Sequence, residues 1–236
     1  MTDVAPPASL TIEHTTPLPL IVRTLGIVPY DESLAEQRRL HAERVAGSIP
    51  DTLLLLEHPH VYTLGRRSDP GHILVDEGFL HAHGATIAHN ERGGEVTYHG
   101  PGQLVAYPIM LLQPAERSIT SLVRRMEAVI AATLGEFGLE ASLVLGEPGV
   151  WVNGRKIASI GMAVRRWVVL HGMALNVDPD LTYFSYINPC GHAGLQVTSL
   201  ARELGAAPSM ESVHAAFARQ FAVMFGRTMA PEVVVA

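Results

Sequence analysis

The order of helical and strand-like segments constrains the fold of this chain more than any single motif. Three segments have the apolar spacing of amphipathic helices, namely 31–47, 118–139 and 209–227. The strand-like runs between them do not alternate with helices one for one, as a regular βαβ fold requires. The longest β-rich stretch, 149–177, turns at Asn153-Gly154, a pair typical of a hairpin. This order predicts an α+β fold, a single domain with a mixed central sheet flanked by helices.

Local signals indicate where the elements begin and end. Ser118 can cap the start of the helix at 118–139. Gly47 and Gly138 can end the first and second helices, because glycine adopts the left-handed conformation that closes a helix. A short helix is expected at 76–84. Further strand-like runs are expected at 51–59, 61–67, 85–92 and 95–112.

The chain of 236 residues is expected to form one domain, since no repeat or long linker divides it. Residues 1–20 are rich in proline and threonine, so we expect a flexible N-terminal extension there and assign the domain to 21–236. The start lacks the basic and apolar regions of a secretion signal. No run reaches the roughly 18 apolar residues of a membrane helix. We therefore expect a cytoplasmic, monomeric protein that is not attached to a membrane.

Composition narrows the possible partners. The net charge of −6 argues against bulk binding to nucleic acid. A single cysteine cannot form an internal disulfide, which fits a reducing compartment. Twelve histidines invite a metal interpretation, but there is no cysteine pair and no HExxH motif. We predict no metal site.

Two residue types occur once each, Cys190 and Lys156. Cys190 lies in the turn-forming segment NPCGHAG, and loops of this kind carry reactive groups more often than packing groups. A thiol needs a nearby cation or base to become a good nucleophile. Lys156 can supply either, since its ammonium is compact and can lose a proton, whereas the guanidinium of arginine stays protonated. The alternatives are an inert buried cysteine and a surface lysine retained by chance.

Lys156 follows the Asn153-Gly154 turn and opens the alternating run KIASIGMAV. A side chain at the start of a strand beside a loop is rarely part of the core, so we expect its replacement to leave the fold intact.

The glycine-rich segment RGGEVTYHGPGQ, residues 92–103, is a candidate ligand wall, because glycines let backbone N–H groups approach a ligand closely. An ordinary hairpin is the alternative. His99 and His171 each precede a glycine at the end of a β-rich run. Either can serve as a base or an orienting group beside a thiol. A simple hydrogen bond to a neighbouring carbonyl is an equally good interpretation.

Four segments together resemble the motifs of lipoyl(octanoyl) transferases, within the wider biotin/lipoate protein ligase fold group. They are RGGEVTYHGPGQLVAYPI, GVWVNGRKIASIGMAVRRWVVLHGMALNV, INPCG and VTSL, and the match runs from about residue 30 to about residue 205. The resemblance implies that an octanoyl group moves from acyl carrier protein to the ε-amine of a lysine. The acceptors are lipoyl domains of 2-oxoacid dehydrogenase E2 subunits and the glycine-cleavage H protein. This is the first step of endogenous protein lipoylation, and it needs no cofactor.

The resemblance also implies roles for individual residues. Cys190 is the nucleophile that forms a thioester acyl-enzyme, and Lys156 is the acid/base. The acyl pocket is lined by Arg92, Gly93, Gly94, His99, Gly161, His171 and Gly172, with Arg66 on the same surface. An acidic carrier protein needs a local basic patch on a chain of net negative charge. We expect that patch among Arg66, Arg67, Arg92, Arg165 and Arg166.

Two other functions stay open. One is an ATP-dependent lipoate or biotin protein ligase of the same fold, which needs no cysteine nucleophile. The other is a non-catalytic module that binds acyl groups or lipoyl domains.

Overall fold

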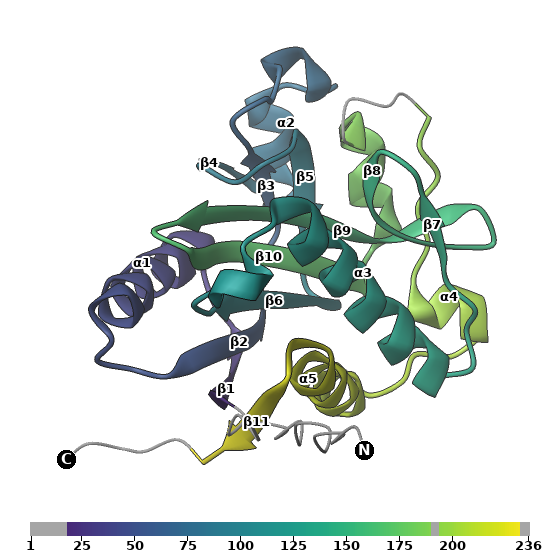
Figure 1. Ribbon diagram of the computed structural model, residues 1–236. Helices are drawn as coiled ribbons and strands as arrows, with labels where there is room; N and C mark the ends of the chain where they lie inside the picture. The colour runs from purple at the N-terminus through teal and green to yellow at the C-terminus, as the bar shows by residue number, and fades with distance from the viewer. Residues whose placement is uncertain (1–17, 190–193, 232–236) are drawn as a thin grey trace, which may run out of the picture.

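Two sheets, with helices on both faces of the larger one, make up the fold (Figure 1). The computed structural model describes residues 18–189 and 194–231. The large sheet has eight strands in the order β11-β1-β2-β6-β10-β9-β8-β7. They are β1 (Leu18–Ile27), β2 (Asp51–Glu57), β6 (Gln103–Ile109), β7 (Ser142–Val144), β8 (Glu147–Val152), β9 (Arg155–Arg165), β10 (Val168–Asn176) and β11 (Arg227–Ala230). The small sheet, in the order β4-β3-β5, contains β3 (Val61–Leu64), β4 (Thr86–His89) and β5 (Val96–His99).

The large sheet is mixed, as predicted. Strand β1 pairs in parallel with β2 and β11. The remaining neighbours pair in antiparallel fashion, including β9 with β8 across the Asn153-Gly154 turn. The predicted α+β class is therefore confirmed.

Helices form at the three amphipathic segments and at the short helix expected at 76–84, whereas a further helix at 200–204 has no counterpart among the predictions. They are α1 (Tyr30–Ala46), α2 (Glu77–Ala82), α3 (Ile119–Glu136), α4 (Leu200–Leu204) and α5 (Met210–Phe225). Ser118 caps α3, since its side chain accepts a hydrogen bond from the Ser121 N–H. Gly47 ends α1 in the left-handed conformation, with φ of 76°. The predicted roles of Ser118 and Gly47 are confirmed, and the left-handed Gly138, with φ of 78°, directly follows Phe137, the C-cap of α3.

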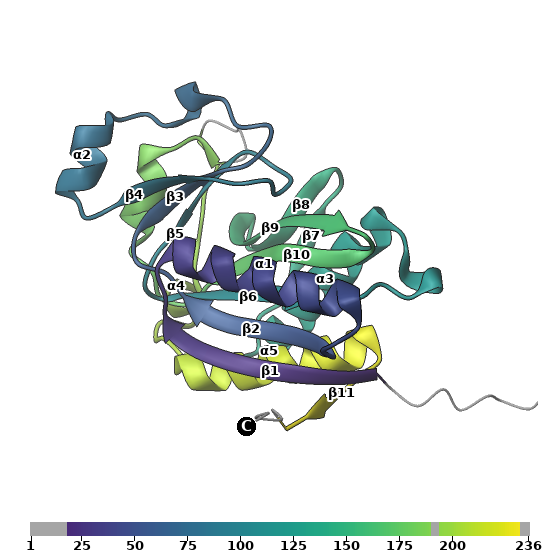
Figure 2. The same ribbon diagram turned by 90° about the vertical axis from the view of Figure 1, so that its left-hand side faces the viewer.

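The apolar run in strand β2 is continuous because both faces of the strand are buried. Leu53 and Leu55 pack into the core shared with α3 and α5, whereas Leu54 and Leu56 pack on the opposite face with Leu40 of α1. Figure 2 shows α1 on one side of the sheet and α5 on the other. A strand covered on both faces needs apolar residues at every position.

The predicted boundary of the N-terminal extension is wrong by a few residues. Strand β1 begins at Leu18, and Leu20 is fully buried in the core shared with α3 and α5. Residues 18–20 therefore belong to the domain, and 1–17 lie outside the described residues. Within the described residues, the structure contains no helix of sufficient length and apolarity to cross a membrane.

The small sheet packs against the segment that leads towards Cys190. Tyr62 donates its hydroxyl to the Tyr183 carbonyl at 2.8 Å. The ring of Tyr183 stacks on His60 with centroids 4.2 Å apart. Phe184 and Ile187 join the apolar cluster of this sheet. The stretch from 181 to 187 is thus fixed to the small sheet by rings, a hydrogen bond and buried apolar contacts.

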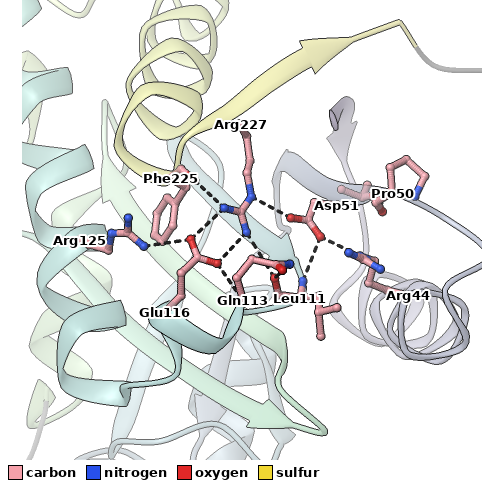
Figure 3. Close-up of polar contacts among 10 residues, drawn as sticks. Arg44, Pro50, Asp51, Leu111, Gln113, Glu116, Arg125, Phe225 and Arg227 are labelled. Carbon is pink, nitrogen blue, oxygen red and sulfur yellow. Dashed lines mark hydrogen bonds and ion pairs between the residues drawn. The ribbon is translucent and has the colours of Figure 1, made fainter. Parts of the chain in front are cut away.

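A buried ion network ties the end of the chain to the middle of the fold (Figure 3). Arg227 of β11 donates from Nε to Asp51 Oδ2 at 2.9 Å and from Nη1 to Glu116 Oε1 at 2.8 Å. Asp51 also accepts from Arg44 Nε at 2.7 Å, and Glu116 from Arg125 Nη1 at 3.1 Å. Only 3% of the Arg227 side chain is exposed, and that of Asp51 is fully buried.

Replacing Arg227 with methionine should destabilise the fold by about 3 kcal/mol, towards the lower end of the range for breaking a buried ion pair. The loss stays near that end because Asp51 keeps Arg44 and Glu116 keeps Arg125. The matched control is Arg219→Met, whose partner Glu136 is at the surface, and it should lose about 1 kcal/mol or less. Urea unfolding of both variants measures the difference, and equal losses would contradict a structural role for the network.

Candidate active site

Two adjoining hollows lie between the 92–99 segment and strand β9. The inner pocket, of about 50 Å³, is lined by residues that include Tyr30, Arg92, Thr97, His99, Tyr107, Ser159, His171 and Gly172. The outer pocket, of about 460 Å³, is lined by residues that include Arg66, Arg67, Gly93, Ile119, Leu122, Val123, Pro148, Lys156 and Met162. Gly94, Glu95, Ile160 and Gly161 line both hollows. The two pockets therefore share one wall.

The structure gathers nine of the ten predicted site residues around these hollows. Arg66, Gly93 and Lys156 line the outer pocket, and Arg92, His99, His171 and Gly172 line the inner one, while Gly94 and Gly161 belong to both. Cys190 lies outside the described residues. Among residues 18–189 and 194–231, no three or more His, Cys, Asp or Glu side chains gather where a metal ion could be held.

The shared wall depends on a close backbone contact at Gly161. The Gly93 N–H donates to the Met162 carbonyl at 3.1 Å, which lays the glycine-rich segment on β9. A Cβ at Gly161 would lie 3.0 Å from both the Gly93 oxygen and Arg92 Cδ. Since real Cβ atoms rarely come so close, a side chain here would push the segment off the strand and change both hollows.

The Arg92 guanidinium shapes the glycine-rich segment from inside. Its Nη2 donates to the carbonyls of Thr63 and Glu95, each at 2.6 Å, and its Nη1 donates to the Gly93 carbonyl at 3.1 Å. The residue is buried. The prediction that Arg92 lines the pocket agrees with this arrangement. Its predicted place in an exposed basic patch is wrong, because its charge is directed at backbone carbonyls.

The two predicted histidines are buried and uncharged at neutral pH. Burial lowers the pKa of His99 to about 3 and that of His171 to about 4. His99 Nδ1 lies 3.2 Å from Gln103 Oε1, and the backbone N–H of His171 donates to Gln37 Oε1 at 3.1 Å. A histidine of such low pKa is a weak base. Their low pKa values therefore favour a wall or orienting role for both histidines over proton abstraction.

Lys156 is the second residue of β9. Its backbone is hydrogen-bonded to residues 196–198, which follow Cys190 in the sequence. Its N–H donates to the Gln196 carbonyl, and its carbonyl accepts from the Thr198 N–H, both at 2.9 Å. Its side chain is only 3% exposed. The expectation that this residue stands outside the core is wrong, because Lys156 is buried and its ammonium lies over the Trp151 ring.

The ammonium group of Lys156 is held at the outer pocket. Nζ donates to the Pro148 carbonyl at 3.1 Å and lies 4.9 Å from the centre of the Trp151 ring. Gly149, which follows Pro148, has φ of 144°, a conformation that other residue types rarely adopt. A Cβ at this position would lie 2.6 Å from Lys156 Cε. Gly149 thus gives the lysine stem room to reach the pocket.

Several lining residues carry no signal in the sequence. Ile119, Leu122 and Val123 form one wall of the outer pocket from the first turns of α3, yet their apolar spacing indicates only a core helix. Tyr30 and Tyr107 close the inner pocket from α1 and β6. These residues reach the site through tertiary contacts that no local pattern records.

Comparison with known proteins places these observations in a family. Residues 29–222 match the model of the lipoyl protein ligase A/B catalytic domain. The octanoyltransferase of Solibacter usitatus is 47% identical over 89% of this chain and 94% of its own length. The octanoyltransferase of Syntrophobacter fumaroxidans is 44% identical over 86% of this chain and 89% of its own length.

Solved structures show the same fold at low sequence identity. A lipoate-protein ligase A bound with ATP superposes with a TM-score of 0.70 at 18% identity, covering 92% of this chain and 90% of that one. A chain from a structural analysis of a bi-partite lipoate protein ligase and its E2 lipoyl domain from Thermoplasma acidophilum gives a TM-score of 0.71 at 18% identity, covering 93% of this chain and 88% of that one.

Replacing Gly149 with alanine should displace Lys156 and destabilise the protein by about 1–3 kcal/mol, because it adds backbone strain and an overpacked contact. Gly135→Ala is the matched control. Gly135 lies within α3 with open space around it, so alanine should stabilise the protein by about 0.5–1 kcal/mol. Acyl-transfer rate and thermal unfolding are measured on both, and an alanine at 149 that leaves the rate unchanged would contradict this placement of Lys156.

The buried histidines should make the fold sensitive to mild acid. Burial lowers the pKa of His58, His99 and His171 to about 4, 3 and 4. The unfolded chain therefore binds more protons once the pH falls below about 6.5. Each histidine should remove up to about 1.4 kcal/mol of stability per pH unit below that value. Urea unfolding from pH 7.5 to 5 tests this, and His99→Gln should give a shallower pH dependence than the wild type.

Proposed function

The chain belongs to the lipoyl protein ligase A/B catalytic domain family, and from that premise we propose that it is an octanoyltransferase of protein lipoylation. It transfers an octanoyl group to the ε-amine of a lysine on an acceptor domain. The observation that carries this function is the placement of Lys156, which is buried yet directed at a pocket of about 460 Å³. The walls of that pocket include Ile119, Leu122 and Met162, which suit an acyl chain.

The reaction runs in two balanced steps. In the first, the Cys190 thiolate attacks the carbonyl carbon of the octanoyl thioester, and the carrier thiol leaves with a proton. In the second, the acceptor amine attacks the Cys190 thioester, an amide forms, and the cysteine thiol is restored. Lys156 accepts and returns the proton in each step. The first step exchanges one thioester for another and is close to balance, and the second converts a thioester into the more stable amide, so neither step uses ATP.

The described residues on both sides of Cys190 support its pairing with Lys156. Before it, the Asn188 N–H donates to the His72 carbonyl at 2.8 Å. After it, residues 196–198 pair directly with the backbone of Lys156. A segment six to eight residues after the cysteine is therefore hydrogen-bonded to the backbone of the proposed acid/base. Lys156 can then supply the adjacent base or cation that a thiol nucleophile requires.

Partners of this function follow from the two substrates. The donor is octanoyl-acyl carrier protein, and the acceptors are lipoyl domains of 2-oxoacid dehydrogenase E2 subunits and the glycine-cleavage H protein. Arg66 and Arg67 at the rim of the outer pocket, with Arg165 and Arg166, form the basic patch for the carrier. Arg92 is not part of it. We also propose that the protein is a monomer and that it acts in the cytoplasm.

Incubation with octanoyl-acyl carrier protein and no acceptor should add one octanoyl mass to the peptide that contains Cys190. Neutral hydroxylamine should remove it, because thioesters are cleaved under these conditions. The Cys190→Ala variant is the matched control and should carry no adduct. Intact-protein and peptide mass spectrometry make the measurement with and without ATP. An adduct that requires ATP, together with ATP-dependent pyrophosphate exchange, would identify a ligase. Binding without any adduct would identify a non-catalytic module.

A further inference from the structure

One peptide group connects a buried carboxylate to the amine of Lys156. The carbonyl of Pro148 accepts from Lys156 Nζ at 3.1 Å. The N–H of the same peptide, on Gly149, donates to Glu127 Oε1 at 3.3 Å. Glu127 projects from α3 and is only 1% exposed. Both hydrogen bonds therefore belong to a single chain that runs from carboxylate to ammonium.

We propose that Glu127 is a positioning residue for Lys156, acting through the Pro148–Gly149 peptide. This inference rests on the proposed role of Lys156 as acid/base. The carboxylate fixes the plane of the peptide, so that its carbonyl meets Nζ at the edge of the outer pocket. It also strengthens that carbonyl as an acceptor, because hydrogen bonds in a chain polarise one another. Both effects hold the Lys156 amine at the site where the proposed proton transfer takes place.

The burial of Glu127 is not explained by its ion pair. Its second oxygen accepts from Arg124 at 2.8 Å, but Arg124 is 43% exposed and lies three residues earlier on the same helix. Such pairs contribute little to stability. Removing a carboxylate from water is costly unless its remaining acceptor sites are satisfied. The Gly149 N–H satisfies one of them, and this is the bond that leads to Lys156.

Gly149 makes this arrangement possible. Its φ of 144° suits glycine, and the absence of a side chain lets the Lys156 stem lie directly against the peptide. Among the described residues, the other charged groups that line the outer pocket or pair beside the lysine are Arg66, Arg67, Glu95, Glu147 and the Arg155–Glu203 ion pair. Glu127 differs from them in that it is hydrogen-bonded to the peptide that receives Nζ.

The test separates charge from shape. Glu127→Gln keeps the size of the side chain and an oxygen that can accept from Gly149, but removes the negative charge. Losing that charge disfavours the ammonium, so the rising limb of kcat against pH should move to lower pH by about half a unit or more. The KM for octanoyl-acyl carrier protein should change little. Glu127→Leu removes the hydrogen bond as well, and we expect kcat to fall at least about tenfold.

Two further variants make the outcome decisive. Glu136→Gln makes the same chemical change on the same helix, at a surface pair with Arg219, and should leave the profile in place. Lys156→Ala is assayed in parallel, and substantial transfer by that variant would overturn the acid/base role itself. Loss of transfer in Lys156→Ala, with an unmoved profile in Glu127→Gln, would overturn only the role of Glu127. Thermal unfolding is recorded for every variant. If Glu127→Leu does not fold, the pH profile of Glu127→Gln decides the outcome.

Discussion

The contact between the glycine-rich segment and strand β9 is the constraint on which the whole site depends. Arg92 draws the carbonyls of Thr63, Gly93 and Glu95 around one guanidinium, which joins the small sheet to this segment. Gly161 then lets the segment lie on β9 without a side chain between them. Both hollows share that wall, so any shift of it would alter the two together.

The two pockets differ in the make-up of their walls. The inner pocket is lined by uncharged histidines and tyrosines, together with Arg92 and Glu95. The outer pocket combines apolar residues of α3 with Arg66 and Lys156. The outer pocket therefore suits the proposed octanoyl thioester, which is apolar over most of its length and reactive at one end.

The sequence predicted those parts of the structure that depend on local spacing. The helices, the Ser118 cap and the hairpin at Asn153-Gly154 follow from periodicity and turn chemistry. Resemblance of motifs placed Gly93, Gly161 and Lys156 around one site, although the position of Cys190 lies outside the described residues. The burial of Lys156 does not follow from its position at a strand start, because it depends on tertiary contacts such as the one between its ammonium and the Trp151 ring. Arg92 was misjudged as part of an exposed patch because a sequence shows a charge but not the carbonyls that surround it.

The burial of Lys156 has a consequence for what the protein can modify. An enzyme that attaches acyl groups to lysine risks becoming its own acceptor, since an activated thioester reacts with nearby amines. This chain contains one lysine, and that side chain is only 3% exposed, with Nζ bonded to Pro148. Arginine supplies the other sixteen of its seventeen basic side chains and remains protonated, so it cannot act as a nucleophile. The surface of the protein therefore presents no lysine ε-amine to an acyl-enzyme of another copy.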